Sequence, residues 1–412
     1  MPEPAIAGKP RELGFDSKRL TRISSHFRDY VDDGRLAGWS LLVSRRGQVA
    51  YSDHYGQRDL STGAPIENDT IYRIYSMTKP ITTVAAMILY EEGAFDLNDP
   101  VEKFIPSFAN QRVYLSGSAS TANTAGVLQP MAIHHLMSHT AGLTYGFLHA
   151  HAIDEMYRNA GYEWDYPAGH DLAACCDDWA GLPLLFQPGD EWNYSVASDV
   201  LGRIVEVASG MTLDEFFRTR IFEPLAMDDT SFWADTEERQ ARLATLYTRN
   251  PADGSAVPID AMGKAALHKP KMLSGGGGLV STIGDYHRFT QMLLNRGELD
   301  GERLLGSRTV DYMAINHLPG GQDLPAYGRP IFTETAHAGM GFGLGFSVVI
   351  DRAATKLACS DGEYSWGGAA STGFWIDPAE EITAVFMTQL LPSSTYPLRP
   401  EFRQLVYQAL ID

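Results

Sequence analysis

Residues 74–80 read Ile-Tyr-Ser-Met-Thr-Lys-Pro and lead directly into an apolar run at 81–89. The run predicts a helix that begins near Ser76 and continues to about Gly93. Ser76 and Lys79 lie three residues apart, so they share one face of that helix, with the hydroxyl at the positive end of the helix dipole. Pro80 fits the first turn, where its missing N–H would have no partner. This arrangement can make a serine nucleophilic, but a lone Ser-x-x-Lys also occurs by chance, so the rest of the sequence must decide.

The composition predicts a globular chain of enzyme size. Its 412 residues are 44% hydrophobic and 20% charged, which indicates one or two closely joined domains. The formal net charge of −18 argues against nucleic acid as a partner, because that binding depends on Lys and Arg. The three cysteines provide neither a disulfide framework nor metal spacing. No signal peptide and no run of about 20 apolar residues is present, so we expect a cytoplasmic protein without a membrane span.

Hydrophobic periodicity divides the chain into an early sheet, a helical middle and a late sheet. Residues 16–32 predict an amphipathic helix capped by Asp16 or Ser17, and residues 39–44 and 48–51 predict a hairpin. Helical patterns then lie at 133–138, 196–209, 213–220 and 286–296. Strand-like segments follow at 341–350, 363–367, 373–376 and 382–389, and a helix closes the chain at 401–411.

This order predicts an α+β fold in which the early hairpin completes a sheet built mainly from C-terminal strands. We expect a discontinuous sheet domain made of residues 1–90 and 315–412, with residues 91–314 forming a mainly helical domain beside it. Ser76 would face a cleft between the two.

Two further stretches carry candidate site residues. Residues 188–196, Pro-Gly-Asp-Glu-Trp-Asn-Tyr-Ser-Val, form a turn that leads to Tyr194 just before a helical pattern. Residues 364–369, Tyr-Ser-Trp-Gly-Gly-Ala, predict a strand whose paired glycines allow the close approach of another backbone or a substrate. Without the first motif, Tyr194 and Trp366 would be read as packing residues.

In combination, these motifs resemble those of the serine β-lactamase and penicillin-binding-protein superfamily, and more narrowly the β-lactamase-like carboxylesterases called family VIII. Ser-Met-Thr-Lys matches the first superfamily motif. The triplet beginning at Tyr194 stands where Tyr-x-Asn belongs, and Trp366-Gly367-Gly368 stands where Lys-Thr-Gly belongs. The order and spacing fit from about residue 15 to the end, and residues 134–143 also resemble a superfamily segment. The resemblance implies an antiparallel sheet flanked by helices.

The resemblance implies a role for each site residue. Serine needs a nearby base, and Lys79 can serve if burial disfavours its ammonium form. Tyr194 can relay a proton to the leaving alkoxide. Whether the base is Lys79, Tyr194 or the pair titrating together stays open. The main-chain N–H groups of Ser76 and Ala369 would form the oxyanion hole.

Two departures from the superfamily pattern bear on the substrate. A lactamase or peptidase holds a substrate carboxylate with the lysine of Lys-Thr-Gly and an amide with the asparagine of Tyr-x-Asn. Trp366 stands at the first of these positions and offers only a neutral N–H. Val196 stands at the second and offers no hydrogen bond from its side chain. We therefore expect Trp366, Gly367, Gly368 and Val196 to bind a neutral, moderately hydrophobic acyl ester, with no metal and no cofactor.

Three other patterns are rivals to this interpretation. Ser371 imitates the G-x-S-x-G nucleophile elbow, but a strand-like segment and no histidine follow it. His134, His135 and His139 match no zinc spacing. The Ser-Gly-Gly-Gly-Gly run at 274–278 has no P-loop lysine and is interpreted as a flexible turn beside the cleft.

The leading hypothesis is a carboxylesterase for short-chain acyl esters that works through a Ser76 acyl-enzyme, and the shared acylation machinery leaves room for weak β-lactam hydrolysis. The alternatives are a β-lactamase or D-amino-acid peptidase, or an acyltransferase that passes the acyl group to an alcohol. A non-catalytic homologue is disfavoured by the intact Ser76, Lys79 and Tyr194.

Overall fold

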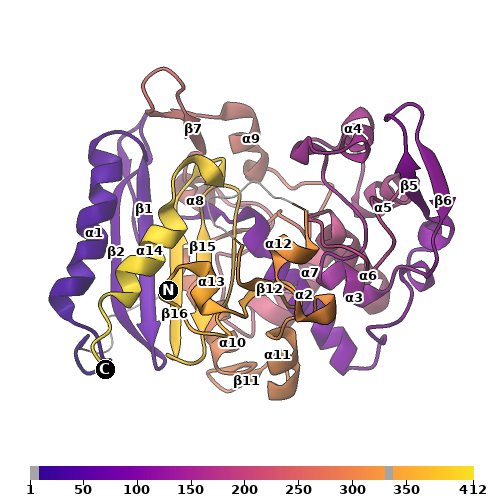
Figure 1. Cartoon of the computed structure of the whole chain (residues 1–412). Coiled ribbons are helices and arrows are strands. Elements are labelled where there is room, and N and C mark those ends of the chain that lie inside the picture. The colour runs from indigo at the N-terminus through magenta and orange to yellow at the C-terminus, as the bar shows by residue number, and fades with distance from the viewer. Residues whose placement is uncertain (1–8, 330–336) are drawn as a thin grey trace.

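The computed structural model describes residues 9–329 and 337–412 of the chain. In Figure 1 a sheet with a helix on its outer side stands on the left, and a group of helices stands on the right. The sheet contains strands from both ends of the sequence, and the middle of the chain is mainly helical. This confirms the predicted α+β class, whereas the domain boundaries at residues 90 and 315 stay a prediction.

The main sheet has eight strands in the order β12-β13-β14-β15-β16-β1-β2-β3, and every neighbouring pair is antiparallel. The strands are β1 (Gly38–Arg45), β2 (Gln48–Asp59), β3 (Ala64–Pro65), β12 (Met340–Phe342), β13 (Ser347–Val349), β14 (Tyr364–Gly367), β15 (Gly373–Asp377) and β16 (Ile382–Met387). Leu42 of β1 lies opposite Val385 of β16, so the early and late parts of the chain meet inside one sheet.

Side chains along the central strands alternate between two hydrophobic cores, one on each face of the sheet. Leu41 and Phe386 belong to the core that contains residues of α1 and α14, whereas Leu42 and Val385 belong to the core that contains residues of α2 and α10. This is the period of two that a sheet covered on both faces requires. The covering helices are α1 (Ser17–Asp32), α2 (Thr78–Glu91), α10 (Ile283–Leu294) and α14 (Leu398–Tyr407).

The first and last helices lie side by side on the sheet (Figure 1). Asp16 caps α1 by accepting a hydrogen bond from the N–H of Arg19 at 2.9 Å, which confirms the helix predicted at 16–32. The closing helix α14 begins and ends earlier than the predicted 401–411. Its following residues pair with the N-terminal segment instead, since the Ala409 carbonyl accepts from the N–H of Asp16 at 2.8 Å.

The prediction of one strand at 341–350 is wrong in detail, because this segment contains the separate strands β12 and β13. They are joined by a tight turn in which the N–H of Gly343 donates to the Phe346 carbonyl at 2.8 Å. Gly345 has a φ of +94° in this turn, and a Cβ there would lie 2.5 Å from the Thr83 hydroxyl. The turn therefore packs against α2 at a point where only glycine fits.

Apart from one short helix between β13 and β14, the other helices lie in the helical group on the right of Figure 1 or connect it to the sheet. They are α3 (Ile133–Met137), α4 (Ala152–Asn159), α5 (Leu172–Ala180), α6 (Ala197–Ser209), α7 (Leu213–Phe217), α8 (Glu237–Arg242), α9 (Asp260–Lys264), α11 (Ser307–Met313), α12 (Leu324–Tyr327) and α13 (Arg352–Thr355). The helix predicted at 213–220 changes to a π-turn, Arg218–Phe222, after α7. No helix in residues 9–329 or 337–412 is long and apolar enough to cross a membrane.

Four small sheets complete the secondary structure. They pair β4 (Tyr72–Arg73) with β9 (Val280–Ser281), β5 (Arg112–Ser116) with β6 (Asn123–Gly126), β10 (Glu298–Leu299) with β11 (Glu302–Arg303), and β7 (Tyr247–Arg249) with β8 (Ala256–Pro258) and β17 (Leu390–Leu391). The β4–β9 pair lies directly before α2 and α10 in the sequence, and the Tyr286 hydroxyl of α10 donates to the Met77 carbonyl at 2.9 Å. These contacts hold the start of α2 in place.

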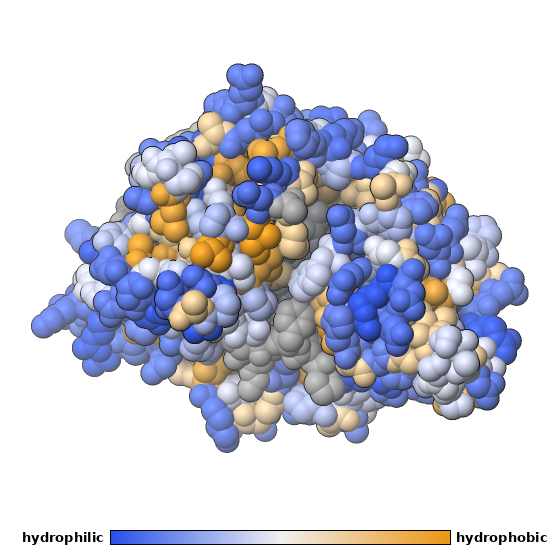
Figure 2. All heavy atoms as spheres, turned by 90° about the horizontal axis from the view of Figure 1, so that it is seen from above, coloured by the Kyte–Doolittle hydropathy of each residue, from blue (hydrophilic) through white to orange (hydrophobic). Residues whose placement is uncertain are grey.

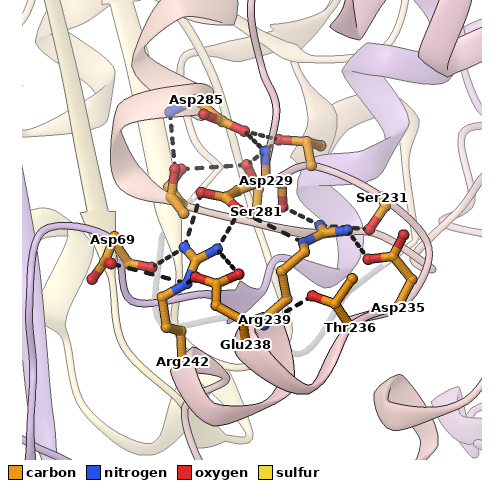
Figure 3. Close-up of polar contacts among 12 residues, drawn as sticks. Asp69, Asp229, Ser231, Asp235, Thr236, Glu238, Arg239, Arg242, Ser281 and Asp285 are labelled. Carbon is orange, nitrogen blue, oxygen red and sulfur yellow. Dashed lines mark hydrogen bonds and ion pairs between the residues drawn. The ribbon is translucent and has the colours of Figure 1, made fainter. Parts of the chain in front are cut away.

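A polar network joins α8 to the first turn of α10 (Figure 3). Arg242 binds both carboxylate oxygens of Asp229, at 2.6 and 2.9 Å. The N–H of Asp229 and the hydroxyl of Thr230 donate to Asp285 at 2.9 and 2.8 Å. The Asp285 side chain is fully buried, so this network brings a carboxyl group into the interior of the protein.

Candidate active site

Ser76 lies in a short 3₁₀ turn, Tyr75–Met77, that runs directly into α2. Tyr75 has a φ of +43°, an uncommon value for a residue other than glycine, and it turns the chain into the helix. The N–H of Ile74 is held by the Leu279 carbonyl at 3.0 Å, which ties the turn to the strand β9 region. The helix predicted after Ser76 is confirmed, with its α-helical part beginning at Thr78.

Lys79 reaches back from the first turn of α2 to Ser76. Its ammonium nitrogen lies 3.2 Å from the Ser76 Oγ, 3.1 Å from the Tyr145 hydroxyl and 2.6 Å from the Gly276 carbonyl oxygen. The side chain is almost completely buried, with 1% of its surface exposed. All three donor positions of an ammonium group therefore have an acceptor.

Tyr194 approaches Ser76 from the other side. Its hydroxyl donates to the Ser76 Oγ at 2.5 Å, and the Lys79 ammonium lies 4.5 Å from the centre of its ring. The ring packs against Trp366 and His139, with centroids 5.5 and 5.1 Å away. The structure thus brings together the three predicted catalytic side chains around one oxygen atom. Lys79 or Tyr194 can receive a proton from Ser76 once one of them has lost its own.

Tyr145 is a further residue of the site that the sequence analysis did not include. Besides its contact with Lys79, its ring lies 5.3 Å from that of Tyr194. Burial, and then the charge of Asp199, raise the pKa of Tyr145 well above its ordinary value, so it stays a neutral phenol. Tyr145 stands two residues after the superfamily-like segment at 134–143. Reading that segment two residues further would have included Tyr145 among the candidates.

The turn between β14 and β15 places Ala369 beside the nucleophile. The N–H of Gly368 donates to the Thr372 carbonyl at 2.9 Å and closes the turn. A Cβ on Gly368 would lie 2.3 Å from the carbonyl oxygen of Ile74, so glycine lets this turn approach the Ser76 segment. Within the described chain, no group accepts a hydrogen bond from the Ala369 N–H. That N–H is the donor predicted for the oxyanion hole, together with the N–H of Ser76.

Arg399 of α14 holds the same turn from outside. Its guanidinium donates to the carbonyls of Gly368 and Thr372 at 2.6 and 2.9 Å. A Cβ on Gly367 would lie 2.2 Å from the guanidinium carbon, and one on Gly373 would lie 3.1 Å from the Arg399 stem. The two glycines, which pair across β14 and β15, therefore provide the space that Arg399 occupies.

The site opens into a cavity of about 700 Å³. The residues around Ser76 that line it include Tyr145, Tyr194, Trp366 and Ala369. Much of the remaining wall is apolar: Phe147, Trp164, Phe232, Met262, Met272, Met340 and Phe374. Figure 2 shows hydrophobic residues beside a hollow near the middle of the face seen from above.

The four predicted substrate-binding residues differ in their position. Trp366, Gly367 and Gly368 line the cavity, and the indole N–H of Trp366 has no acceptor among the described residues. Val196 instead packs in the main hydrophobic core at the start of α6 and is 3% exposed. The described cavity wall does not include Val196, so its predicted contact with substrate gains no support.

The contacts of Ser371 and His139 bear on the rival interpretations of these residues. Ser371 is buried and donates to the Leu390 carbonyl at 2.7 Å, and it is absent from the described cavity wall. His139 is buried beside Tyr194, and its Nδ1 lies 3.2 Å from the Ser195 hydroxyl. Burial, and then the charge of Lys79, lower the pKa of His139 well below its ordinary value, so its ring is neutral. No group of three or more His, Cys, Asp or Glu side chains in the described ranges could hold a metal ion.

Comparison with known proteins gives the family. The model of the family described as Beta-lactamase matches residues 23–408. The chain belongs to the beta-lactamase family. Membership of the beta-lactamase family confirms the predicted superfamily and fold, and it makes the protein a serine hydrolase, whereas the narrower placement in family VIII stays a prediction.

Individual relatives are similar over nearly their whole length. Protein Rv1367c of Mycobacterium tuberculosis (strain ATCC 25618 / H37Rv) is 34% identical over 89% of this chain and 88% of its own. Esterase EstB of Burkholderia gladioli is 28% identical over 97% of this chain and 98% of its own. The solved structure of EstCE1, described as a hydrolase with promiscuous acyltransferase activity, has a TM-score of 0.80 and 27% identity, with 97% of this chain and 99% of that chain covered.

Proposed function

We propose that the protein is a carboxylesterase that hydrolyses short-chain acyl esters through an acyl-enzyme on Ser76. The observation that carries this proposal is the contact of the Ser76 Oγ with both the Lys79 ammonium nitrogen, at 3.2 Å, and the Tyr194 hydroxyl, at 2.5 Å. The similarity to an esterase, EstB of Burkholderia gladioli, supports the choice of an ester as substrate.

The proposed reaction has two halves. The Ser76 Oγ attacks the ester carbonyl carbon while its proton passes to the Lys79–Tyr194 pair, which reacts with one proton removed, as the Lys79 amine or the Tyr194 phenolate. The N–H groups of Ser76 and Ala369 bind the resulting oxyanion. Collapse of this intermediate breaks the bond to the alcohol, which leaves with a proton from Tyr194. Water then attacks the acyl-enzyme by the reverse sequence, which releases the acid and restores Ser76.

The side chain at position 366 of the cavity wall supports a neutral acyl group over a carboxylate-bearing one. Trp366 contributes an indole N–H and an apolar face at the position where a lactamase has a lysine, and much of the wall is hydrophobic. A substrate carboxylate that loses its hydration without gaining a charged partner at this position would be poorly stabilised.

Acyl transfer to an alcohol is the second candidate, because EstCE1 is described as having promiscuous acyltransferase activity and a cavity of about 700 Å³ has room for an acyl-enzyme and an acceptor.

Intact-mass analysis during turnover of p-nitrophenyl butyrate, p-nitrophenyl octanoate and benzylpenicillin tests both ester hydrolysis and acyl transfer. We expect a butyryl adduct on wild-type protein and none on Ser76→Ala. Adding an alcohol acceptor separates hydrolysis from transfer through the product, acid or new ester. A stable penicilloyl adduct with no butyryl adduct would overturn the esterase proposal.

A further inference from the structure

The Ser-Gly-Gly-Gly-Gly run at 274–278 passes between α6 and α2, directly behind the catalytic lysine. A Cβ on Gly276 would lie 2.5 Å from the Asp199 Oδ2 and 3.0 Å from the Tyr145 hydroxyl. A Cβ on Gly275 would lie 2.7 Å from the Ser198 carbonyl oxygen. Such short contacts do not occur for real side chains, so these glycines let the loop fit between the two helices. The run is a tightly packed turn that lines the cavity, so the predicted turn beside the cleft is confirmed, whereas its flexibility stays a prediction.

Asp199, in the first turn of α6, reaches Lys79 through this loop. Its Oδ1 accepts hydrogen bonds from the Ser274 hydroxyl at 2.6 Å and from the Gly276 N–H at 3.0 Å. The carbonyl of the same Gly276 accepts a hydrogen bond from the Lys79 ammonium at 2.6 Å. One glycine residue thus connects a buried carboxylate to a buried ammonium group.

The two charges lie in an interior without another ion pair for either of them. Asp199 and Lys79 are each 1% exposed. Within residues 9–329 and 337–412, neither forms a direct salt bridge, and the Oδ2 of Asp199 has no hydrogen-bond donor. An isolated charge at such a position would be strongly disfavoured, so each group gains from the other's charge.

The other titratable groups around Asp199 are uncharged. They come from three segments: Tyr145 and Tyr166 from loops, and Cys175 and Cys176 from α5. Burial raises the pKa of each of these four groups, which keeps them protonated near neutral pH. Burial also raises the pKa of Asp199 itself, and the positive charge of Lys79 opposes this rise. Lys79 is therefore the cation whose charge Asp199 balances.

We propose that Asp199 is a positioning residue that holds the Gly276 carbonyl against Lys79 and supplies the negative charge that sets the pH range of catalysis. This inference rests on the proposed function of Ser76, Lys79 and Tyr194. A negative charge close to a proton-accepting pair favours its protonated form. Whether the base is Lys79 or Tyr194, removal of that charge makes the base available at lower pH.

Asp199→Asn tests the proposal, because the amide keeps the oxygen that Ser274 and Gly276 bind while it removes the charge. The acid limb of kcat/KM against pH reports the base of the free enzyme. For p-nitrophenyl butyrate we expect this limb to move to lower pH by about one unit, the size of effect that a nearby opposite charge typically has. An unmoved limb, or one moved to higher pH, would overturn the proposal.

Two controls separate charge from structure. Ser274→Ala removes a hydrogen bond to Asp199 but keeps the carboxylate, so its acid limb should match that of the wild type whatever its activity. Asp285→Asn replaces another buried carboxyl in the first turn of a helix, one that is absent from the described cavity wall, and should also leave the limb in place. If Asp199→Asn folds poorly, Asp199→Ala provides a second test, and we expect its acid limb to move to lower pH as well.

A measurement independent of turnover keeps this inference distinct from the esterase proposal. In Ser76→Ala protein labelled with ¹⁵N-lysine, the Lys79 Nζ signal is identified by its loss in Lys79→Met. We expect its titration midpoint to fall when Asp199→Asn is added. A midpoint that does not change would overturn the role of Asp199 even if Ser76 proves to be the nucleophile. A midpoint that falls would support the role even if esters prove to be poor substrates.

Discussion

Ser76 is distinguished from the other candidate nucleophile, Ser371, by its neighbours. Ser76 contacts Lys79 and Tyr194 at the cavity wall, whereas the Ser371 hydroxyl is buried and donates to a main-chain carbonyl. We expect a fluorophosphonate to label Ser76 and Ser76→Ala to abolish both labelling and ester turnover. Peptide mapping by mass spectrometry locates the label. Ser371→Ala serves as the control and should keep its activity; a label on Ser371 would contradict the assignment.

In the proposed mechanism Lys79 and Tyr194 act together as the proton acceptor, because both contact the same oxygen atom. We expect Lys79→Ala and Tyr194→Phe each to lower kcat by ~10²-fold or more, the usual contribution of a positioned acid–base group. The double variant should be little worse than either single one, because residues that act as a unit are not additive. Steady-state kinetics with p-nitrophenyl butyrate measures this, with the partly exposed Tyr90→Phe as control. Fully multiplicative losses would argue against a coupled pair.

Among individual residues, the sequence predicted the site residues that belong to short motifs. Ser76 and Lys79 could be placed together because helix geometry alone fixes their relation. Tyr194 could be added because the resemblance places it where Tyr-x-Asn belongs, although Val196 replaces the asparagine. Tyr145 and Asp199 could not, since their approach to Lys79 depends on how a loop and α6 pack against α2. An acidic residue in the first turn of a helix, as Asp199 is, is also too common to stand out.

The hairpin β14–β15 and the helix α14 act together on the proposed oxyanion hole. Arg399 holds the Gly368 and Thr372 carbonyls on either side of Ala369. We expect Arg399→Met to lower kcat roughly tenfold with little change in KM, because a displaced donor loses part of the 10²- to 10³-fold effect of a full one. Kinetics with p-nitrophenyl butyrate and the melting temperature are both measured, and Gln404→Ala provides an exposed control on the same helix. An increase in KM at unchanged kcat would mean that Arg399 serves substrate binding instead.

The first turn of α10 contains a carboxyl that makes stability depend on pH. Burial raises the pKa of Asp285 to about 7, whereas an unfolded aspartate titrates near ~4. Between these values the folded state keeps a proton that the unfolded state has lost, so the free energy of unfolding falls as pH rises from about 4 to 7. We expect Asp285→Asn to remove roughly 2 to 4 kcal/mol of this fall, at ~1.4 kcal/mol per unit of pKa. Urea unfolding at pH 4.5, 6 and 7.5 measures it.

The control for this element is Asp311→Asn, which changes a partly exposed aspartate that binds Arg296 at the surface. It should leave the difference in unfolding free energy between pH 4.5 and 7.5 close to that of the wild type. Equal pH dependence in wild-type and Asp285→Asn protein would show that the Asp285 carboxyl is already ionised in the folded state.

Element boundaries were predicted well where local pattern determines them and poorly where a distant segment does. The helix α1 has both its cap and its apolar stripe within its own residues. The strands β12 and β13 are separated because Gly345 packs against Thr83, and α14 ends early because its following residues pair with the N-terminal segment. Neither partner lies near in sequence, so hydrophobic periodicity could not reveal them.

At the scale of the molecule, residues near the two ends of the chain stabilise each other. Phe15 forms a β-bridge with Leu410, and the buried guanidinium of Arg45 binds Glu380 and Asp412, both at 2.7 Å. We expect deletion of residues 409–412 to lower the free energy of unfolding by about 1 to 3 kcal/mol, since it leaves hydrogen-bonding groups without partners. Urea unfolding measures the loss, and Asp412→Asn separates the ion pair from the backbone pairing. An unchanged unfolding midpoint would show that this pairing contributes nothing.

The groups around Ser76 come from parts of the chain that are synthesised at very different times. Ser76 and Lys79 belong to the first quarter, Tyr194 and Gly276 to the middle, and Ala369 and Arg399 to the last tenth or so of the sequence. Contacts between such distant segments form late in folding, because each requires a long loop to close. A chain still emerging from the ribosome therefore carries Ser76, the proposed nucleophile, without the turn proposed to stabilise the oxyanion. The proposed active site is therefore complete only after the last part of this sequence has been synthesised.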